Sequence, residues 1–198
     1  MGLIRSTDHS DYNTTKPSLW FIFFKGDVLV KKTQVSQNRI PLCHKKEIEN
    51  LIPENIQFLG LFHKTQCFTC ESPAELTLES PYEFINLRRL YGTMDTDFWN
   101  MAGYARQISD FYKNFTYCSK CGTENKQIKN EHAVTCPDCR MVNYPRIYPA
   151  IITAVIRQDE ILLARGANFP NKKMYSVLAG FVEPGETLED CVTREIFE

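Results

Sequence analysis

The pattern of apolar and polar positions begins with two apolar runs that flank a short polar turn. Residues 19–24 (LWFIFF) and residues 28–30 (VLV) lie on either side of Lys25-Gly26-Asp27. Two apolar runs joined by a turn that contains glycine predict a β-hairpin. Residues 44–52 are predicted to form a short helix, and residues 56–70 are predicted to add further strands.

Apolar residues at helical spacing then predict a long helix over residues 97–115. The positions recur at steps of three or four and are Phe98, Met101, Ala102, Ala105, Ile108, Phe111 and Phe115. Residues 1–112 contain no catalytic motif that we recognise. We interpret them as an α+β domain that ends in a connecting helix.

The last part of the chain predicts short strands followed by a helix. Residues 150–156 are rich in β-branched side chains, and a turn at 158–160 leads into a second apolar stretch at 161–164. Residues 174–178 predict another strand before a loop at 179–185. Leu188, Val192 and Ile196 then recur every fourth residue, which is typical of the apolar face of a helix.

Composition and charge exclude some classes of protein. The chain has 198 residues, is 43% hydrophobic and carries a formal net charge of -1. This size and composition predict one or two globular domains, without the basic excess of a nucleic-acid or membrane-surface binder. No apolar run is long enough for a transmembrane helix, and the N-terminus lacks the apolar stretch of a signal peptide. We therefore expect a cytoplasmic protein whose eight cysteines bind metal or remain free thiols.

Four of these cysteines have the spacing of a zinc site. Cys118 and Cys121 form one C-x2-C pair, and Cys136 and Cys139 form another. Turn-forming residues accompany both pairs, so four thiolates can surround one Zn²⁺ ion tetrahedrally. The pattern resembles a zinc ribbon, in which the metal is structural because no ligand position stays open. The alternatives are unrelated thiols or two disulfides.

A third pair, Cys67 and Cys70, has no partner pair nearby. His63 lies four residues earlier, so a second metal site is conceivable. Ordinary packing in a strand is the alternative interpretation, and we favour it. Cys43 and Cys191 are also expected to pack as small apolar residues.

Carboxylates gather on the last predicted helix. Glu195 and Glu198 are three residues apart and therefore share a helix face. Crowded carboxylates repel one another unless cations lie between them, and Mg²⁺ or Mn²⁺ is bound by such oxygen ligands together with phosphate. A merely solvated charged face is the alternative.

The same residues resemble most of a Nudix box, G-x5-E-x7-R-E-U-x-E, where U is a bulky aliphatic residue. Gly180, Glu186, Arg194, Glu195, Ile196 and Glu198 stand at the required positions. The resemblance implies an α/β/α sandwich with a mixed sheet, and hydrolysis of a nucleoside diphosphate linked to another group.

Family membership also implies roles for individual residues. Glu195 and the backbone carbonyl of Ala179 would bind the catalytic metal, Arg194 would orient the carboxylates, and Glu186 would brace the loop against the helix. Glu198 matches the first of two terminal glutamates, and the second would be the residue after it. We therefore expect that this 198-residue chain, truncated within the Nudix box, turns over little substrate.

A zinc ribbon directly before a Nudix segment resembles the NADH pyrophosphatase family, also called NAD diphosphatase. Residues 115–198 carry the likeness, which includes the segment at 144–149 (YPRIYP) and the segment at 178–186 (LAGFVEPGE). The resemblance implies that NAD(H) and water give nicotinamide mononucleotide and AMP, and bacterial members of this family can also remove NAD caps from RNA. It also implies substrate contacts by Glu131, Tyr144 and Phe181, and a homodimer.

Together these patterns predict a multidomain α+β and α/β protein in three parts. Residues 1–112 are the N-terminal domain, residues 113–144 the zinc ribbon, and residues 145–198 the first part of a Nudix domain. Two other functions stay open. One is a Nudix hydrolase of ADP-ribose or a nucleotide sugar, and the other is a non-catalytic zinc-ribbon module that binds nucleic acid or protein.

Overall fold

Two compact units make up the chain, Met1–Pro145 and Arg146–Glu198. A computed structural model describes residues 2–6, 16–32, 39–52, 56–73, 75, 81–169 and 171–198. The predicted fold class, a mixed α+β protein with a four-cysteine ribbon, is confirmed. The predicted domain boundaries after residues 112 and 144 stay predictions.

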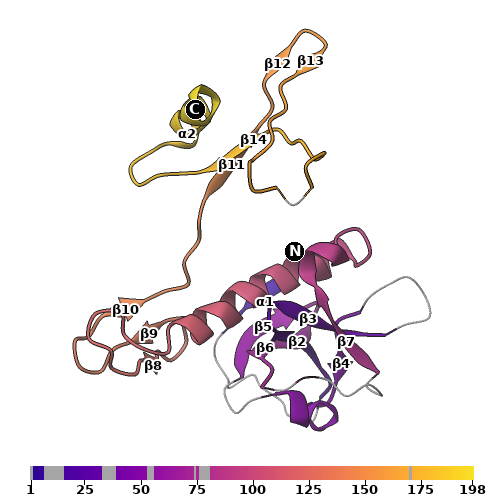
Figure 1. Cartoon of the computed structure of the whole chain (residues 1–198). Helices are drawn as coiled ribbons and strands as arrows, with labels where there is room; N and C mark the ends of the chain where they lie inside the picture. Colours follow the sequence, from indigo (N-terminus) through magenta and orange to yellow (C-terminus); the bar gives the residue numbers. More distant parts are fainter. Residues whose placement is uncertain are drawn as a thin grey trace. The chain divides into compact units, whose positions relative to one another are not determined.

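A seven-stranded mixed sheet forms most of the first unit (Figure 1). Its strands are β1 (Leu3–Arg5), β2 (Ser18–Phe24), β3 (Asp27–Lys31), β4 (Leu42–Cys43), β5 (Gln57–Phe62), β6 (Thr65–Glu71) and β7 (Tyr82–Asn86). The main path runs β1-β5-β6-β2-β3-β7, and β4 pairs with the start of β2. Strands β2 and β6 are parallel, and the other pairs among the described strands of this sheet are antiparallel.

Strand β2 is buried on both faces because its apolar run is continuous. Phe21 packs in the cluster on one face of the sheet, and Trp20 packs in the cluster on the other face. The predicted hairpin is confirmed. Its turn is Lys25 and Gly26, with φ of 48° and 98°, and Asp27 already belongs to β3.

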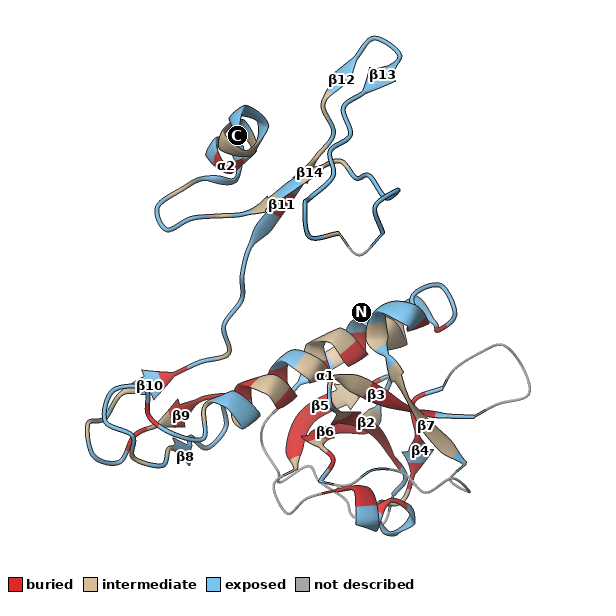
Figure 2. Ribbon diagram, viewed as in Figure 1, coloured by how far each residue is buried: buried red, intermediate tan, exposed pale blue. Residues whose placement is uncertain are grey.

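Helix α1 (Thr96–Asn114) packs on the sheet through its predicted apolar face. Figure 2 shows buried residues along this face, and Met101, Ala105 and Ile108 lie in the same cluster as Phe21. Asp95 caps the helix, because its carboxylate accepts hydrogen bonds from the backbone N–H groups of the first turn. Each end of the helix lies one residue before the predicted position.

The prediction of a single helix over residues 44–52 is wrong. The segment forms two 3-10 turns, Lys45–Glu47 and Glu49–Leu51, and a further 3-10 turn covers Leu87–Leu90. Ile48 separates the first two turns with a φ of −128° and is completely buried. Pro53 follows closely in the sequence and disfavours a helix at the residue before it.

The first unit ends in a small three-stranded sheet, in the order β10-β9-β8. Its strands are β8 (Lys126–Gln127), β9 (Val134–Thr135) and β10 (Val142–Asn143). The hydroxyl of Tyr112 on α1 lies 3.3 Å from Nδ1 of His132 in the β8–β9 loop. This contact and the neighbouring backbone hydrogen bond from Asn125 to the Thr116 carbonyl join the small sheet to the end of the helix.

The second unit contains two strand pairs and one helix. The elements are β11 (Ala150–Thr153), β12 (Ile156–Arg157), β13 (Glu160–Ile161), β14 (Leu178–Phe181) and α2 (Leu188–Phe197). Strand β11 pairs with β14, and β12 pairs with β13, both antiparallel. Large apolar side chains such as Ile152 and Phe197 remain exposed in this unit.

Three predictions for the second unit need correction. The strand predicted over 161–164 ends at Ile161, and residues 174–178 contribute a bridge between Ser176 and Ala164 before β14 begins. The loop predicted at 179–185 starts later, because Ala179, Gly180 and Phe181 pair with β11. Backbone pairing with a neighbouring strand decides these bounds, and local sequence does not reveal it.

None of the helices in the described ranges combines the length and the apolar character that crossing a bilayer requires.

Candidate metal centres

The four cysteines of the predicted ribbon lie together in the first unit. The Sγ atoms of Cys118, Cys121, Cys136 and Cys139 are all within 4.8 Å of one another. Direct separations are 3.5 Å between Cys118 and Cys139 and 3.4 Å between Cys121 and Cys136. Four sulfurs that each lie about 2.3 Å from one tetrahedral Zn²⁺ ion have spacings close to these.

Each C-x2-C pair sits in a turn of the same design. The backbone N–H of Lys120 donates to Cys118 Sγ, and that of Cys139 donates to Cys136 Sγ, both at 3.4 Å. The residue after each second cysteine has a positive φ, 77° at Gly122 and 60° at Arg140. The repeated geometry aims four sulfurs at one point.

Hydrogen bonds lower the pKa of two of the four thiols, Cys118 and Cys121. Hydrogen bonds from the backbone, that of Lys120 first, lower the pKa of Cys118. The hydroxyl and backbone N–H of Thr123 lower the pKa of Cys121 to about 6. Thiolates held this close repel one another unless a metal ion shares their charge, so the donor set fits Zn²⁺.

No second cysteine site forms from Cys67 and Cys70. Cys67 is buried in the cluster on the α1 face of the sheet, and Cys70 is buried in the cluster on the opposite face. Their positions in β6 therefore direct the two thiols apart. Burial raises the pKa of each thiol to about 12, which keeps both neutral. Within the described ranges, the ribbon cysteines are the one group of three or more Cys, His or carboxylate side chains whose ligand atoms lie close enough together to share one ion.

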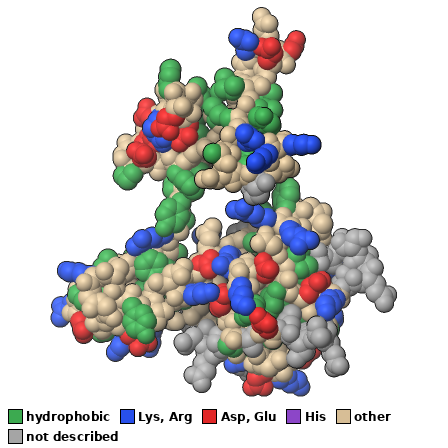
Figure 3. Space-filling view, viewed as in Figure 1, with side chains coloured by type: hydrophobic (Ala, Val, Ile, Leu, Met, Phe, Trp, Pro, Cys, Tyr) green, Lys and Arg blue, Asp and Glu red, His purple; other side chains and the backbone are tan. Residues whose placement is uncertain are grey.

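A second centre of charge surrounds Arg194 on α2. Its Nε and Nη2 donate to the two carboxylate oxygens of Glu186 at 2.9 and 3.0 Å. Its Nη1 donates to Glu195 at 2.9 Å and to Glu198 at 3.1 Å. Figure 3 shows this group as acidic side chains around a basic one over α2. The geometry therefore brings together four side chains that the sequence pattern selected.

Arg194 also ties the helix to the preceding strand. Its Nη2 donates to the backbone carbonyl of Phe181 at 3.0 Å, and the buried Cys191 lies beneath it with Sγ 3.5 Å from the same nitrogen. Glu186 additionally accepts from the N–H of Glu183 at 3.0 Å. The Arg194 guanidinium, the larger influence, lowers the pKa of Glu186 to about 2. The carboxylates in turn raise the pKa of Arg194, with Glu186 contributing most.

Gly180 lets strand and helix approach closely. A Cβ at this position would collide with the carboxylate of Glu195. The glycine of the sequence pattern therefore makes room for a carboxylate beside β14. Ala179 precedes it in the strand, and the role of its carbonyl as a metal ligand stays a prediction.

Thr187 caps the N-terminus of α2, which was not predicted from the sequence. Thr187 Oγ1 accepts from the N–H of Asp190 at 3.1 Å and donates to the Asp190 carboxylate at 2.7 Å. The signal was visible as Thr-x-x-Asp before the helix. This cap sets the helix phase that places Arg194 and Glu195.

The three predicted substrate contacts lie in different units. Glu131 is exposed in the β8–β9 loop, and Tyr144 is 56% exposed after β10, both in the first unit. Phe181 is 68% exposed on β14 in the second unit. The rings of Tyr144 and Phe181 are open to solvent, and joint contact of the three residues with one substrate stays a prediction.

The carboxylate centre carries an excess of negative charge. Glu186, Glu195 and Glu198 face one guanidinium, which leaves two negative charges uncompensated. Carboxylate oxygens are the ligands that Mg²⁺ and Mn²⁺ prefer. Glu198 remains largely exposed, so oxygen ligands from solvent or phosphate have access.

Three protein-family models match the chain in succession. Residues 17–110 match an NADH pyrophosphatase-like rudimentary NUDIX domain, residues 113–142 an NADH pyrophosphatase zinc ribbon domain, and residues 147–198 a NUDIX domain. The N-terminal domain, in which no motif was recognisable, is thus related to the Nudix fold. The four thiols are a structural zinc site, and the Nudix segment implies a divalent metal.

Several curated proteins named "NAD-capped RNA hydrolase NudC" are similar to this chain. One from Pseudomonas fluorescens is 31% identical over 194 residues, which cover 94% of this chain and 66% of the relative. A protein from a second strain of that species is 44% identical over 178 residues, covering 90% of this chain and 60% of the relative. One from Stutzerimonas stutzeri is 42% identical over 112 residues, or 57% of this chain and 40% of the relative. The chain spans about 40% of the length of the first curated relatives it matches.

Proposed function

The chain belongs to the NADH pyrophosphatase family of Nudix hydrolases, and we propose that the whole protein hydrolyses the diphosphate bond of NAD(H). The products are nicotinamide mononucleotide and AMP. The observation that carries the proposal is the arrangement of three carboxylates around Arg194, directly beside Gly180.

In this proposal, Glu195 holds the divalent metal, Mg²⁺ or Mn²⁺, with help from the carbonyl of Ala179 and from Glu198. When bound, such a metal neutralises diphosphate charge and supplies a water of lowered pKa. Arg194 holds Glu195 and Glu198 in place, and Glu186 anchors the other side of the guanidinium. The positions of these carboxylates are therefore fixed by one side chain before substrate binds.

The exposed aromatic rings supply a way to bind the rest of the substrate. A nucleobase that stacks on Phe181 or Tyr144 would gain about 1–3 kcal/mol by analogy with other base-stacking sites. Glu131 is proposed to contact the same substrate. Location in the cytoplasm and assembly as a homodimer belong to this proposal as well.

The decisive experiment measures release of AMP from NADH by the whole protein with Mg²⁺ or Mn²⁺. We expect Glu195→Gln to lower kcat/KM by at least about 100-fold, because a metal ligand is lost. Glu189→Gln is the matched control, since it removes one carboxylate from the first turn of the same helix, away from Arg194. Equal activity of Glu195→Gln and the control would refute the metal-binding role.

Removal of NAD caps from RNA is a second candidate, favoured by the printed names of the relatives. Comparing kcat/KM for NADH, NAD-capped RNA, ADP-ribose and a nucleotide sugar ranks the candidates. A clear preference for ADP-ribose or the nucleotide sugar would contradict the NAD(H) assignment. RNA binding with steep salt dependence and no hydrolysis would instead favour a binding module.

A further inference from the structure

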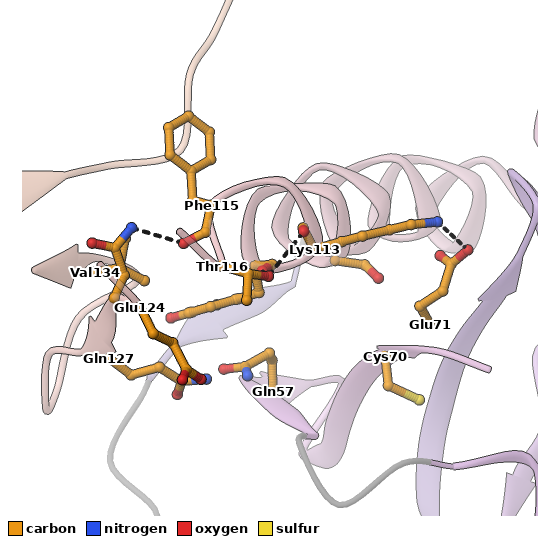
Figure 4. A pocket seen from close by; sticks show the side chains of 12 residues that line it. Gln57, Cys70, Glu71, Lys113, Phe115, Thr116, Glu124, Gln127 and Val134 are labelled. Carbon is orange, nitrogen blue, oxygen red and sulfur yellow. Dashed lines mark hydrogen bonds and ion pairs between the residues drawn. The ribbon is translucent and has the colours of Figure 1, made fainter. Parts of the chain in front are cut away.

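A cavity in the first unit carries polar groups that neither metal centre uses. Its volume is about 290 Å³, and its walls come from β5, β6, the end of α1 and the small sheet (Figure 4). The polar residues used below are Gln57, Glu71, Ser109, Lys113, Glu124 and Asn125. A cavity of this size is at the lower end of the range for small-molecule sites.

Polar atoms without partners are concentrated around this cavity. Glu71 Oε2, Ser109 Oγ and Asn125 Oδ1 are buried and have no hydrogen-bond partner in the part of the chain that the structure describes. All three residues line the cavity, and Ser109 is only 4% exposed. Buried polar atoms are normally satisfied by protein, water or a ligand. Their concentration indicates that a guest supplies the missing hydrogen bonds.

The unpartnered atoms define what the guest must offer. Two of them, Glu71 Oε2 and Asn125 Oδ1, can only accept hydrogen bonds, and the Ser109 hydroxyl can accept as well as donate. Gln57 adds a side-chain amide that points into the cavity from β5 (Figure 4). A guest with N–H donors therefore fits this wall better than a guest with acceptors alone.

The charges around the cavity disfavour an anion. Two carboxylates line it, Glu71 and Glu124, against one ammonium, Lys113. That ammonium is already 2.7 Å from Glu71 Oε1. An incoming phosphate or carboxylate would face uncompensated negative charge.

The remaining lining residues are both polar and apolar. They are Cys70, Tyr112, Phe115, Thr116, Gln127 and Val134. The thiol of Cys70 belongs to the cluster on the other face of the sheet, and the Phe115 ring points away from the cavity (Figure 4), so Tyr112 and Val134 supply the apolar surface. Burial raises the pKa of Tyr112 to about 12, so this ring is neutral at pH 7. A single flat ring that packs on Tyr112 suits a cavity of this volume.

We propose that this cavity is a binding site for a small uncharged molecule that combines one flat ring with a primary amide. The N–H groups of the guest donate to Glu71, Asn125 and Ser109, and its ring lies against Tyr112 and Val134. The site is independent of the proposed NAD(H) hydrolysis, because none of its residues belongs to either metal centre.

A matched pair of probes tests the proposal, nicotinamide and nicotinic acid, which differ by an amide against a carboxylate on the same ring. Titration of the ¹⁵N-labelled protein should show nicotinamide binding at about 1 mM or tighter, with shifted resonances from the residues that line the cavity. Nicotinic acid should bind at least about tenfold more weakly, because of the acidic wall. Equal binding of both probes, or no shifts at about 20 mM nicotinamide, would overturn the proposal.

Two variants make the test specific to the cavity. Ser109→Ala should weaken nicotinamide binding about tenfold, whereas Ser119→Ala, an exposed serine outside the cavity, should not. Glu71→Gln frees Lys113 and should shift the preference toward nicotinic acid, whereas Glu83→Gln on β7 should leave it unchanged. The proposal is overturned if Ser109→Ala binds nicotinamide as the parent does and Glu71→Gln keeps the parent's preference, while both variants have the parent's unfolding midpoint. The cavity would then hold water alone.

Discussion

Helix α1 begins within one segment that matches a Nudix model, and helix α2 lies within another. The two helices differ in what their side chains do, because α1 is buried against a sheet and α2 presents charged groups. Helix α1 contains no glutamate and buries Met101, Ala105 and Ile108 against a seven-stranded sheet. Helix α2 buries only Cys191 and gathers carboxylates around Arg194. A rudimentary Nudix segment can therefore keep the sheet and the apolar core, while another segment carries the carboxylates that surround Arg194.

The thiolate centre and the carboxylate centre differ in the same way. The thiolate centre is closed, because four cysteines use the four positions of tetrahedral zinc. The carboxylate centre stays accessible, with Glu198 largely exposed. Structural and catalytic metals demand these opposite designs, since catalysis requires an open coordination position.

Zinc removal should give the largest effect that separates the two units. We expect one zinc per chain, and we expect chelation to unfold the small sheet, because zinc binding supplies about 10 kcal/mol or more to such modules. Hydrogen exchange should then become fast over residues 117–143 and stay unchanged over 188–197. Cys136→Ser is expected to reproduce the effect, whereas Cys43→Ser should keep its zinc. A zinc-free protein with a protected ribbon would contradict the structural role.

Truncating one isoleucine in each helix should show where packing matters. Ile108→Ala on α1 should lower the free energy of unfolding by about 3 kcal/mol, because a fully buried side chain leaves a cavity. Ile196→Ala on α2 removes a side chain that is 40% exposed and should cost about 1 kcal/mol or less. Both tryptophans, Trp20 and Trp99, lie in the first unit, so their fluorescence follows its denaturation, and hydrogen exchange over residues 188–197 follows that of α2 in the second unit. Equal losses would show that α2 also packs into a core.

Replacing one arginine in each helix should show where charge matters. Arg194→Met should lower kcat/KM for NADH by about 100-fold, because Glu195 and Glu198 lose their common donor. Arg106→Met on α1 breaks an ion pair with Asp110 and should change activity by less than about twofold. Equal losses of activity in two folded variants would contradict a special role of Arg194.

Lowering the pH should decrease the free energy of unfolding of the two units over different pH ranges, with smaller effects than the substitutions above. Burial, more than nearby Arg5, lowers the pKa of His132 to about 4, so the unfolded chain binds this proton first. Stability of the first unit should therefore be complete above pH 6.5 and fall as pH decreases from 6.5 toward 4, by about 1 kcal/mol after allowance for partial exposure. The contact of Glu186 with Arg194 in the second unit is lost at lower pH, between 4.5 and about 2.

His132→Gln tests this assignment, because it should flatten the dependence of tryptophan-detected unfolding between pH 6.5 and 5. Zinc content must be followed in parallel, since acid also protonates thiolates. A slope unchanged by the substitution would assign the pH dependence to other groups.

Much of the carboxylate centre could be predicted from the sequence. Spacing placed Glu195 and Glu198 on one helix face, and the resemblance to a Nudix box selected Glu186 and Arg194. Helix α2, which carries Arg194 and Glu195, follows from Leu188, Val192 and Ile196. Helical periodicity is local, so a single sequence reveals it. The four ribbon cysteines were predictable for the same reason, because each C-x2-C turn is a short-range feature.

Other features could not be predicted because they depend on contacts with residues that are distant in the sequence. The turns around Ile48 were predicted as a helix, although burial against β2 and β6 decides their conformation. Residues 179–181 of β14 were predicted as a loop because their pairing with β11 involves residues nearly thirty positions away. The relationship of residues 17–110 to the Nudix fold rests on the arrangement of a whole domain and on no short motif.

The sequence by itself determined the chemistry, because ligand type and spacing along a turn are properties of neighbouring residues. Only the tertiary structure decided which groups share a site. It placed Glu195 against Gly180, sent Cys67 and Cys70 to opposite faces of the sheet, and surrounded one cavity with unpartnered polar atoms. Strand pairing and packing set these juxtapositions, and both are long-range interactions that no local pattern encodes.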